Sequence, residues 1–310
     1  MYNKALFGIV LFCSIGLSGL SAKVNPDSLK EKYVPKVIIN AKWGDGPGEF
    51  GIDLSSAPYT APGGISVDDN GDIYILDNAN SRIQRFDKNG KLLNIFKVRS
   101  YGLFFGVKDG IIYSGGNLID TLVIINTKSG KKTFVRLSLP GAHSWVESVP
   151  TGYIKNGELI IEQAATELET KRWKLSQVNK GIATFTELSE ALVKPIEKDI
   201  AIEVEEGKNV IIKKGTYPRE LDSEGNYYFI KWWSADTSKV IKISQEGKLL
   251  SIISLPKKDY LIGDFIPRNP IITPSGDIYY LYPTGNIIVK NWKKKFIPGR
   301  IQVIKWELQK

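Results

Sequence analysis

Residues 62–90 constrain the fold of this chain more than any other stretch, because apolar and polar residues alternate along them in short runs. Ile73 and Ile75 lie two positions apart, and a period of two is that of a strand with one buried face. The cluster 68–71 and a second Asp-Lys-Asn-Gly cluster at the end of the stretch contain the residues that form hairpin turns. With residues 91–98 as a further strand, the pattern predicts four antiparallel strands, which make one blade of a β-propeller.

The same residues carry a specific set of motifs. These are a Pro-x-Gly-Ile start, Val-Asp before a glycine turn, Ile-Tyr-Ile, and Asp-x-x-Asn-x-Arg-Ile-x-x-Phe. The set resembles the NHL repeat, and the preceding residues 44–50 resemble the linker that leads into a first NHL blade. Resemblance to the exported bacterial type of this family implies a β-propeller, usually of six four-stranded blades, that serves mostly as a binding platform. It does not name the ligand.

Strand–turn–strand patterns recur along the rest of the chain, so the expected fold class is all-β. Residues 189–215 contain only one clear hairpin. If this region is a degraded blade, the propeller has six blades. If it is the outer hairpin of the third blade, the propeller has five. Analogy with the family favours six. The blades expected after the first span residues 103–139, 145–188, 189–215, 218–255 and 270–306.

A surplus strand at residues 37–43 precedes the first blade, whereas the last blade lacks a fourth strand after residues 300–306. Val37, Ile39 and Ala41 fall on one face of the surplus strand, as a strand with one protected side requires. An unpaired sheet edge favours aggregation, and pairing the two strands removes it. We therefore expect the N-terminal strand to join the last blade and to close the ring.

The N-terminus has the pattern of a secretory signal. Lys4 precedes the apolar residues 5–17, and small residues follow up to Ala22. An uncleaved anchor is the alternative. Cys13 is the single cysteine and leaves with the signal, so the exported chain forms no disulfide. We expect a signal peptide at 1–22, a linker at 23–35 and the propeller at 36–310, in the periplasm, the cell envelope or outside the cell.

The formal net charge is +9. Such a charge suits anionic lipid, acidic glycan or nucleic acid. The lysines are scattered along many predicted strands, however, and this favours an ordinary solvated surface. Because an exported chain seldom meets nucleic acid, we expect no nucleic-acid partner. We also expect a monomer with no membrane span after signal cleavage.

Candidate catalytic and metal-ligating residues are few. His143 is the single histidine, which argues against a His-ligated metal centre, and its loop lacks the nucleophile elbow of a hydrolase. Asp77, Asn78, Asn80 and Asp87 offer oxygen ligands for calcium, but turn formation and hydrogen bonds between blades are the favoured explanation. We predict no catalytic residue and no cofactor, with bound calcium as the alternative.

The loops between blades, and those joining the second and third strands of a blade, form the binding face of a propeller. Exposed aromatic and arginine side chains there are typical of binding hot spots, and packing between blades is the alternative. We expect a non-catalytic binding module for an envelope protein or a glycan. The alternative is a propeller hydrolase or lactonase with a central calcium. The candidate ligand-binding residues are Trp145, Trp232, Trp233, Arg99, Tyr101 and Arg268.

Overall fold

All regular structure in the described part of the chain is β-strand, as predicted, and no helix occurs there. None of these residues therefore forms a helical membrane span. The expected signal peptide and His143 lie outside the described residues. The computed structural model describes residue 29 and residues 31–55, 59–98, 105–115, 121–139, 151–155, 158–164, 170–188, 196–197, 199–205, 208–214, 216, 218–232, 237–261, 270–290 and 293–309.

The first predicted blade is a four-stranded antiparallel sheet in chain order, β2-β3-β4-β5. The turn between β2 and β3 places Gly71 at φ 82°, a conformation that glycine adopts without steric cost. The strands and the turn predicted from residues 62–90 are thus confirmed. The strands span Pro62–Val67, Ile73–Asp77, Arg82–Phe86 and Leu92–Lys97.

The second and third predicted blades form two four-stranded antiparallel units within one eight-stranded sheet. Their outer strands β9 and β13 join the units through a short parallel ladder between residues 136–138 and 182–184. The sequence patterns did not predict this junction. The strands are β6 (Phe105–Lys108), β7 (Ile111–Gly115), β8 (Thr121–Asn126), β9 (Lys132–Ser138), β10 (Thr151–Lys155), β11 (Glu158–Ala164), β12 (Thr170–Asn179) and β13 (Ile182–Glu187).

Residues 189–215 contribute one two-stranded hairpin, as predicted, made of β14 (Ile200–Glu205) and β15 (Lys208–Ile212). The next predicted blade is confirmed as the four-stranded sheet β16-β17-β18-β19. Its strands span Glu220–Leu221, Tyr227–Trp232, Thr237–Ile243 and Leu249–Pro256.

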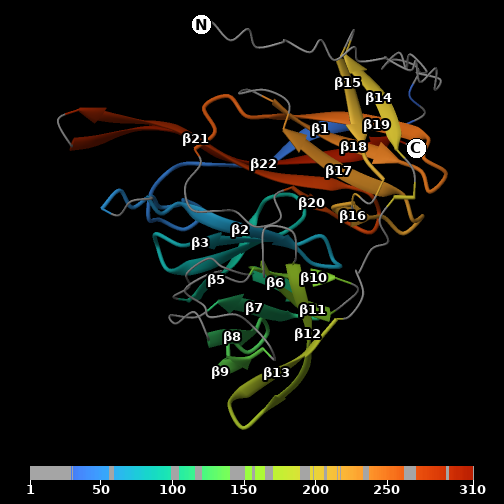
Figure 1. Ribbon diagram of the computed structural model, residues 1–310. Coiled ribbons are helices and arrows are strands. Elements are labelled where there is room, and N and C mark those ends of the chain that lie inside the picture. The colour runs from blue at the N-terminus through green and yellow to red at the C-terminus, as the bar shows by residue number, and fades with distance from the viewer. Residues whose placement is uncertain are drawn as a thin grey trace, which may run out of the picture.

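The last sheet contains strands from both ends of the chain, in the order β1-β22-β21-β20. β1 (Lys32–Ala41) pairs antiparallel with β22 (Lys293–Gln309), so the predicted pairing of the end strands is confirmed; Figure 1 shows blue β1 beside red β22. β1 starts earlier than predicted, within the expected linker. A bulge at Ile38 breaks the predicted alternation, so Val37 is 47% exposed whereas Ile39 is 4% exposed.

The hairpin of β21 (Ile278–Lys290) and β22 extends well beyond the strands predicted for the last blade. β20 (Ile271–Ile272) pairs only with the start of β21. The outer part of the hairpin projects from the stacked sheets, at the left of Figure 1. This projection is a feature that the sequence patterns missed.

Apolar clusters pack the successive sheets against one another. The series runs from β14–β15 through β16–β19, the last sheet, β2–β5 and β6–β9 to β10–β13. Among the described residues, no cluster joins β10–β13 to β14–β15. The chain is therefore an all-β protein of the propeller type, and its described strand units pack in one continuous series.

Candidate functional site

Residues 44–50 form an arm that is held against the first sheet by buried side chains. Asp77 in β3 accepts hydrogen bonds from the Gly51 N–H at 3.0 Å, and from Asn80 Nδ2 and Arg82 Nε at 2.9 Å each. Arg82 also donates to three carbonyl oxygens of the arm at 2.6 to 2.9 Å. Because burial penalises the charged form, the pKa of Asp77 is raised even though these bonds act in the opposite direction.

These contacts match the structural explanation of the Asp/Asn motif. Both carboxylate oxygens of Asp77 accept bonds from protein donors, and Asp87 accepts bonds from N–H groups within its own turn. Asn78 Oδ1 is the buried side-chain atom without a hydrogen-bond partner among the described residues. Within the same part of the chain, no group of three or more His, Cys, Asp or Glu is arranged to hold a metal ion.

An open groove of about 780 Å³ lies between β5 and the first half of β9, and we call it the edge groove. Lys97 and Val98 lie at the end of β5, and Lys132 and Phe134 belong to β9. Phe134 is 61% exposed, which is unusual for a large aromatic side chain. The lining residues are Asn80, Ser81, Arg82, Ile95, Lys97, Val98, Lys132 and Phe134.

The edge groove is basic and partly apolar. Lys97 and Lys132 are both exposed, and none of the described lining residues is acidic. Asn80 and Arg82 are already bonded to Asp77 and to the arm. The hydroxyl group in the lining belongs to Ser81, and this lining includes no His, Asp or Glu that could activate it. The arrangement therefore suits binding of an anionic ligand better than covalent chemistry.

A second polar arrangement recurs in three sheets, and we call it the tyrosine clasp. A cation from the third strand of the sheet lies over the ring of a tyrosine in the second strand, a favourable electrostatic contact. A carboxylate of the preceding turn pairs with the cation at 2.6 to 3.1 Å. The cation and ring centre are 5.6 Å apart for Arg85 and Tyr74, 5.5 Å for Lys242 and Tyr228, and 5.4 Å for Lys305 and Tyr279.

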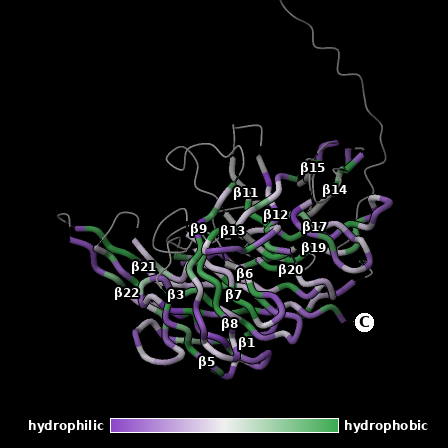
Figure 2. Tube along the Cα trace, turned by 90° about the horizontal axis from the view of Figure 1, so that it is seen from below, coloured by the Kyte–Doolittle hydropathy of each residue, from purple (hydrophilic) through white to green (hydrophobic). Residues whose placement is uncertain are grey.

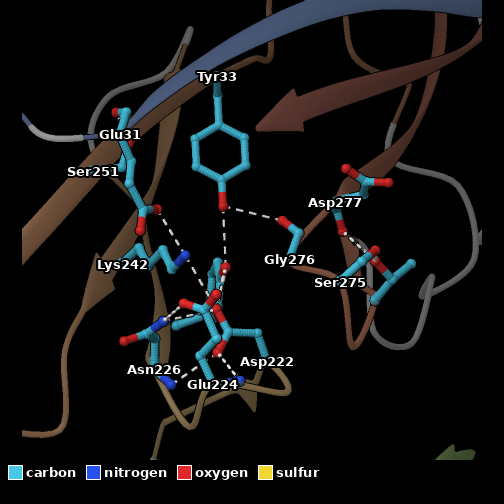
Figure 3. A network of polar contacts seen from close by, with 12 residues as sticks. Glu31, Tyr33, Asp222, Glu224, Asn226, Lys242, Ser251, Ser275, Gly276 and Asp277 are labelled. Carbon is cyan, nitrogen blue, oxygen red and sulfur yellow. Dashed lines mark hydrogen bonds and ion pairs between the residues drawn. The ribbon is translucent and has the colours of Figure 1, made fainter. Parts of the chain in front are cut away.

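The clasp of β16–β19 is buried beneath the start of β1, as Figure 3 shows. Lys242 Nζ lies 2.7 Å from Glu31 Oε2 and 3.1 Å from Asp222 Oδ2. Burial alone lowers the pKa of Lys242, but these carboxylates outweigh it and the pKa is raised. Burial likewise opposes ionisation of Asp222, yet hydrogen bonds from Asn226 and Lys242 leave its pKa lowered.

Tyr33 of β1 completes this network. Its hydroxyl donates to the carbonyl of Gly276 at 3.1 Å (Figure 3). The same hydroxyl lies 3.0 Å from the Tyr228 hydroxyl. One side chain of β1 thus contacts both β16–β19 and the turn between β20 and β21. We call Glu31, Tyr33, Asp222, Tyr228 and Lys242 the N-terminal latch, and its contacts are those of a structural network.

Comparison with known proteins agrees with the arrangement of the first sheet. The family model described as NHL repeat matches residues 60–86. This chain contains an NHL repeat. The predicted resemblance is thereby confirmed, and the NHL repeat supplies the Asp77 and Arg82 that hold the arm. No curated protein matches the chain.

Several solved structures resemble the chain over most of its length at low identity. A member of the DUF4221 family from Bacteroides vulgatus is 10% identical, with 90% of this chain and 99% of that chain covered and a TM-score of 0.47. A protein from Lactobacillus plantarum is 13% identical, with 89% and 100% covered and a TM-score of 0.41. Virginiamycin B lyase from Staphylococcus aureus is 14% identical, with 89% and 99% covered and a TM-score of 0.32. None of these likenesses informs the chemistry of this chain.

The ligand-binding residues expected outside the NHL repeat remain predictions. Trp232 is the last residue of β17, and only its backbone is described. The other candidates lie outside the described residues, namely Trp145, Trp233, Arg99, Tyr101 and Arg268.

Sequence reasoning missed Lys97, Lys132 and Phe134 as members of one site. Their proximity depends on how two sheets pack, which strand patterns do not show. One signal was present: Phe134 precedes the buried Val135 in an alternating strand, so its aromatic ring lies on the polar face.

Proposed function

We propose that this chain is an exported, non-catalytic binding protein built as a six-bladed NHL-type propeller whose ring is closed by β1. Six successive units of antiparallel strands linked by apolar clusters support the blade count, with the β14–β15 hairpin as the reduced blade. The β1–β22 ladder supports the closure. We propose further that the protein acts as a monomer without a cofactor, in the periplasm, the envelope or outside the cell.

We propose the edge groove as the binding site and an extended acidic protein segment as its ligand. The observation that supports this most is the exposed Phe134 next to Lys132, opposite Lys97 on an edge strand. β5 is the last strand of its sheet, so an added strand can pair with its outward N–H and C=O groups. The lysines attract acidic side chains, and the aromatic ring anchors an apolar one. A glycan would leave the strand edge unused.

Fluorescence anisotropy with a labelled peptide of alternating Glu and Val tests this site. Phe134→Ala removes the anchor, and we expect it to weaken binding about tenfold. Lys97→Glu combined with Lys132→Glu should abolish binding, whereas Lys128→Glu with Lys131→Glu, two exposed turn lysines, preserves the same net charge change as a control. Equal binding by the two charge-reversed variants would refute the edge groove. Tighter binding of a heparin oligosaccharide than of the peptide would assign the site to glycans.

A further inference from the structure

The outer part of the β21–β22 hairpin forms a second surface, separate from the edge groove. Trp43 anchors the base of the hairpin, since its Nε1 donates to the Thr284 carbonyl at 2.9 Å and its ring meets Phe296 edge-on at 5.1 Å. Beyond this base the two strands continue as a paired ribbon that projects from the sheets. We define residues 286–290 and 293–297 as the hairpin tip.

The hairpin tip is strongly basic. Lys290 and Lys293 are directly opposite each other in the ladder, and like charges in this position destabilise a sheet. Lys294 and Lys295 follow on β22, while residues 278–306 contain no acidic residue. Lys294 Nζ reaches back to the Leu54 carbonyl at 3.0 Å. The positive charge of Lys290, Lys293 and Lys295 thus has no carboxylate within the hairpin to balance it.

Exposed aliphatic side chains lie among these lysines. Ile288 is 45% exposed, Val289 62% and Ile297 44%. Ile288 pairs with Lys295 across the ladder, so an apolar and a cationic side chain share one face, and Val289 lies on the other face. Figure 2 shows hydrophobic and hydrophilic stretches side by side in this projecting ribbon.

This combination distinguishes between kinds of anionic partner. An acidic glycan needs cations but offers little to aliphatic side chains exposed on both faces of a narrow ribbon. The interface of an anionic bilayer accepts both: aliphatic groups enter the boundary between headgroups and acyl chains, while lysines remain at the level of the headgroups. Each lysine near such a surface strengthens binding about fivefold.

We propose that the hairpin tip docks the protein on an anionic lipid surface, with Ile288, Val289 and Ile297 entering the interface and Lys290, Lys293 and Lys295 contacting the headgroups. Attachment is peripheral and reversible, because the apolar area is small and the charge is screened by salt. The propeller body then stays in water with the edge groove accessible.

Co-sedimentation of residues 23–310, the chain expected after export, with vesicles tests this surface. We expect binding to vesicles of phosphatidylcholine mixed with phosphatidylglycerol, weaker binding to phosphatidylcholine alone, and loss of binding at high salt. Replacing Lys290, Lys293 and Lys295 with Gln should weaken binding about a hundredfold. The matched control replaces Lys88, Lys128 and Lys131, exposed lysines on turns of other sheets, and should weaken it only slightly.

A second variant separates insertion from attraction. Ile288→Thr with Val289→Thr keeps β-branched residues in the strand but removes apolar surface, so we expect unchanged thermal unfolding and several-fold weaker vesicle binding. Equal loss in the two lysine variants would overturn the proposal. Unchanged binding by the threonine variant, together with equal binding to soluble heparin, would overturn it in favour of an acidic glycan.

Discussion

The tyrosine clasps of β2–β5 and β16–β19 have the same local design. In both, the first aspartate of the turn accepts a hydrogen bond from the tyrosine hydroxyl, at 3.2 Å in the first sheet and 3.1 Å in the other. In both, the third residue after that aspartate is a glycine with positive φ, and its N–H bonds back to the aspartate carbonyl. The residue pattern that the two turns share therefore determines the geometry of the turn and the position of the tyrosine ring.

The two clasps differ in what covers them. The side chain of Arg85 in the first clasp is 26% exposed, whereas that of Lys242 in the other is 1% exposed. Glu31, just before β1, and Tyr33 of β1 supply the cover, and they come from a segment far away in the sequence. A solvated ion pair contributes little to stability, but a buried one becomes costly to break. The same arrangement thus contributes little to stability in β2–β5 and more in β16–β19, where residues 31–33 cover it.

Removing β1 and the residues just before it, which cover the clasp of β16–β19, should have the largest effect on stability. Deleting residues 23–41 removes β1, exposes the edge of β22 and strips Glu31 and Tyr33 from the latch. Because the buried Ile39 and the partners it covers each contribute roughly 1.5–3 kcal/mol, we expect a loss of more than about 5 kcal/mol of unfolding free energy. Denaturant titration measures it. A small loss would contradict the proposed closure by β1.

Removing the cationic side chain from each of the two clasps compares their contributions to stability directly. Lys242→Ala leaves Glu31 and Asp222 facing each other without a cation, so we expect a loss of about 3–5 kcal/mol. Arg85→Ala at the equivalent position should cost about 0–1 kcal/mol because its pair is partly solvated. Urea unfolding of both variants measures the difference. Equal losses would show that the cover by β1 does not matter.

The shared turn geometry allows a matched test of the local module. Gly71 and Gly225 have φ of 82° and 79°, so valine at either site is strained by roughly 1–3 kcal/mol. The two losses should be similar, since the Gln245 side chain that the new valine at position 225 would meet is flexible and can move away. Thermal unfolding of the two variants decides this. A neutral result at both sites would mean that the turns tolerate φ below zero.

Alkaline pH should have the smallest effect, a gradual loss of stability as the tyrosines of the two clasps ionise. Burial raises the pKa of Tyr74 and that of Tyr228 above the ordinary 10.0. A raised folded-state pKa gives stability that is complete below the unfolded-state pKa and is lost as pH rises toward the folded-state value. Above pH about 10 we therefore expect unfolding free energy to fall by about 1.4 kcal/mol per pH unit for each such tyrosine.

Phenylalanine variants assign that pH dependence. The ordinary pKa of tyrosine is 10.0. Tyr228→Phe and Tyr74→Phe should each reduce the slope with which the unfolding free energy falls above that pH, because each removes the contribution of one tyrosine. Stability that stays flat across this alkaline range in the unmodified chain would show that neither ring is kept neutral by folding.

The strands were predictable where local pattern decides the structure. The turn at Gly71 and the alternation around Ile75 define β2 and β3 without outside help. The extension of β21 was missed because Pro283 and Gly285 are strong breakers in a sequence. In the structure they flank a bulge, where a strand tolerates a missing donor.

The contacts that set the candidate sites were not predictable in the same way. Lys242 and Glu31 are separated by most of the chain, and no periodicity links them. The edge groove likewise depends on β5 approaching β9, a matter of packing between sheets. Motif reading did find Asp77 and Arg82, because their role is fulfilled within one repeat and its adjoining arm.

The antiparallel pairing of β1 with β22 also determines how the last sheet responds to force. Lys32 faces Gln309, so a pull on these two residues acts at the same end of the ladder. Backbone hydrogen bonds of antiparallel strands run across the strand direction, and such a pull breaks them one after another, like a zipper, instead of shearing them together. The Glu31–Lys242 pair lies at the opening end of this zipper. A tether or partner that strained both ends of the domain would therefore meet that one buried ion pair first.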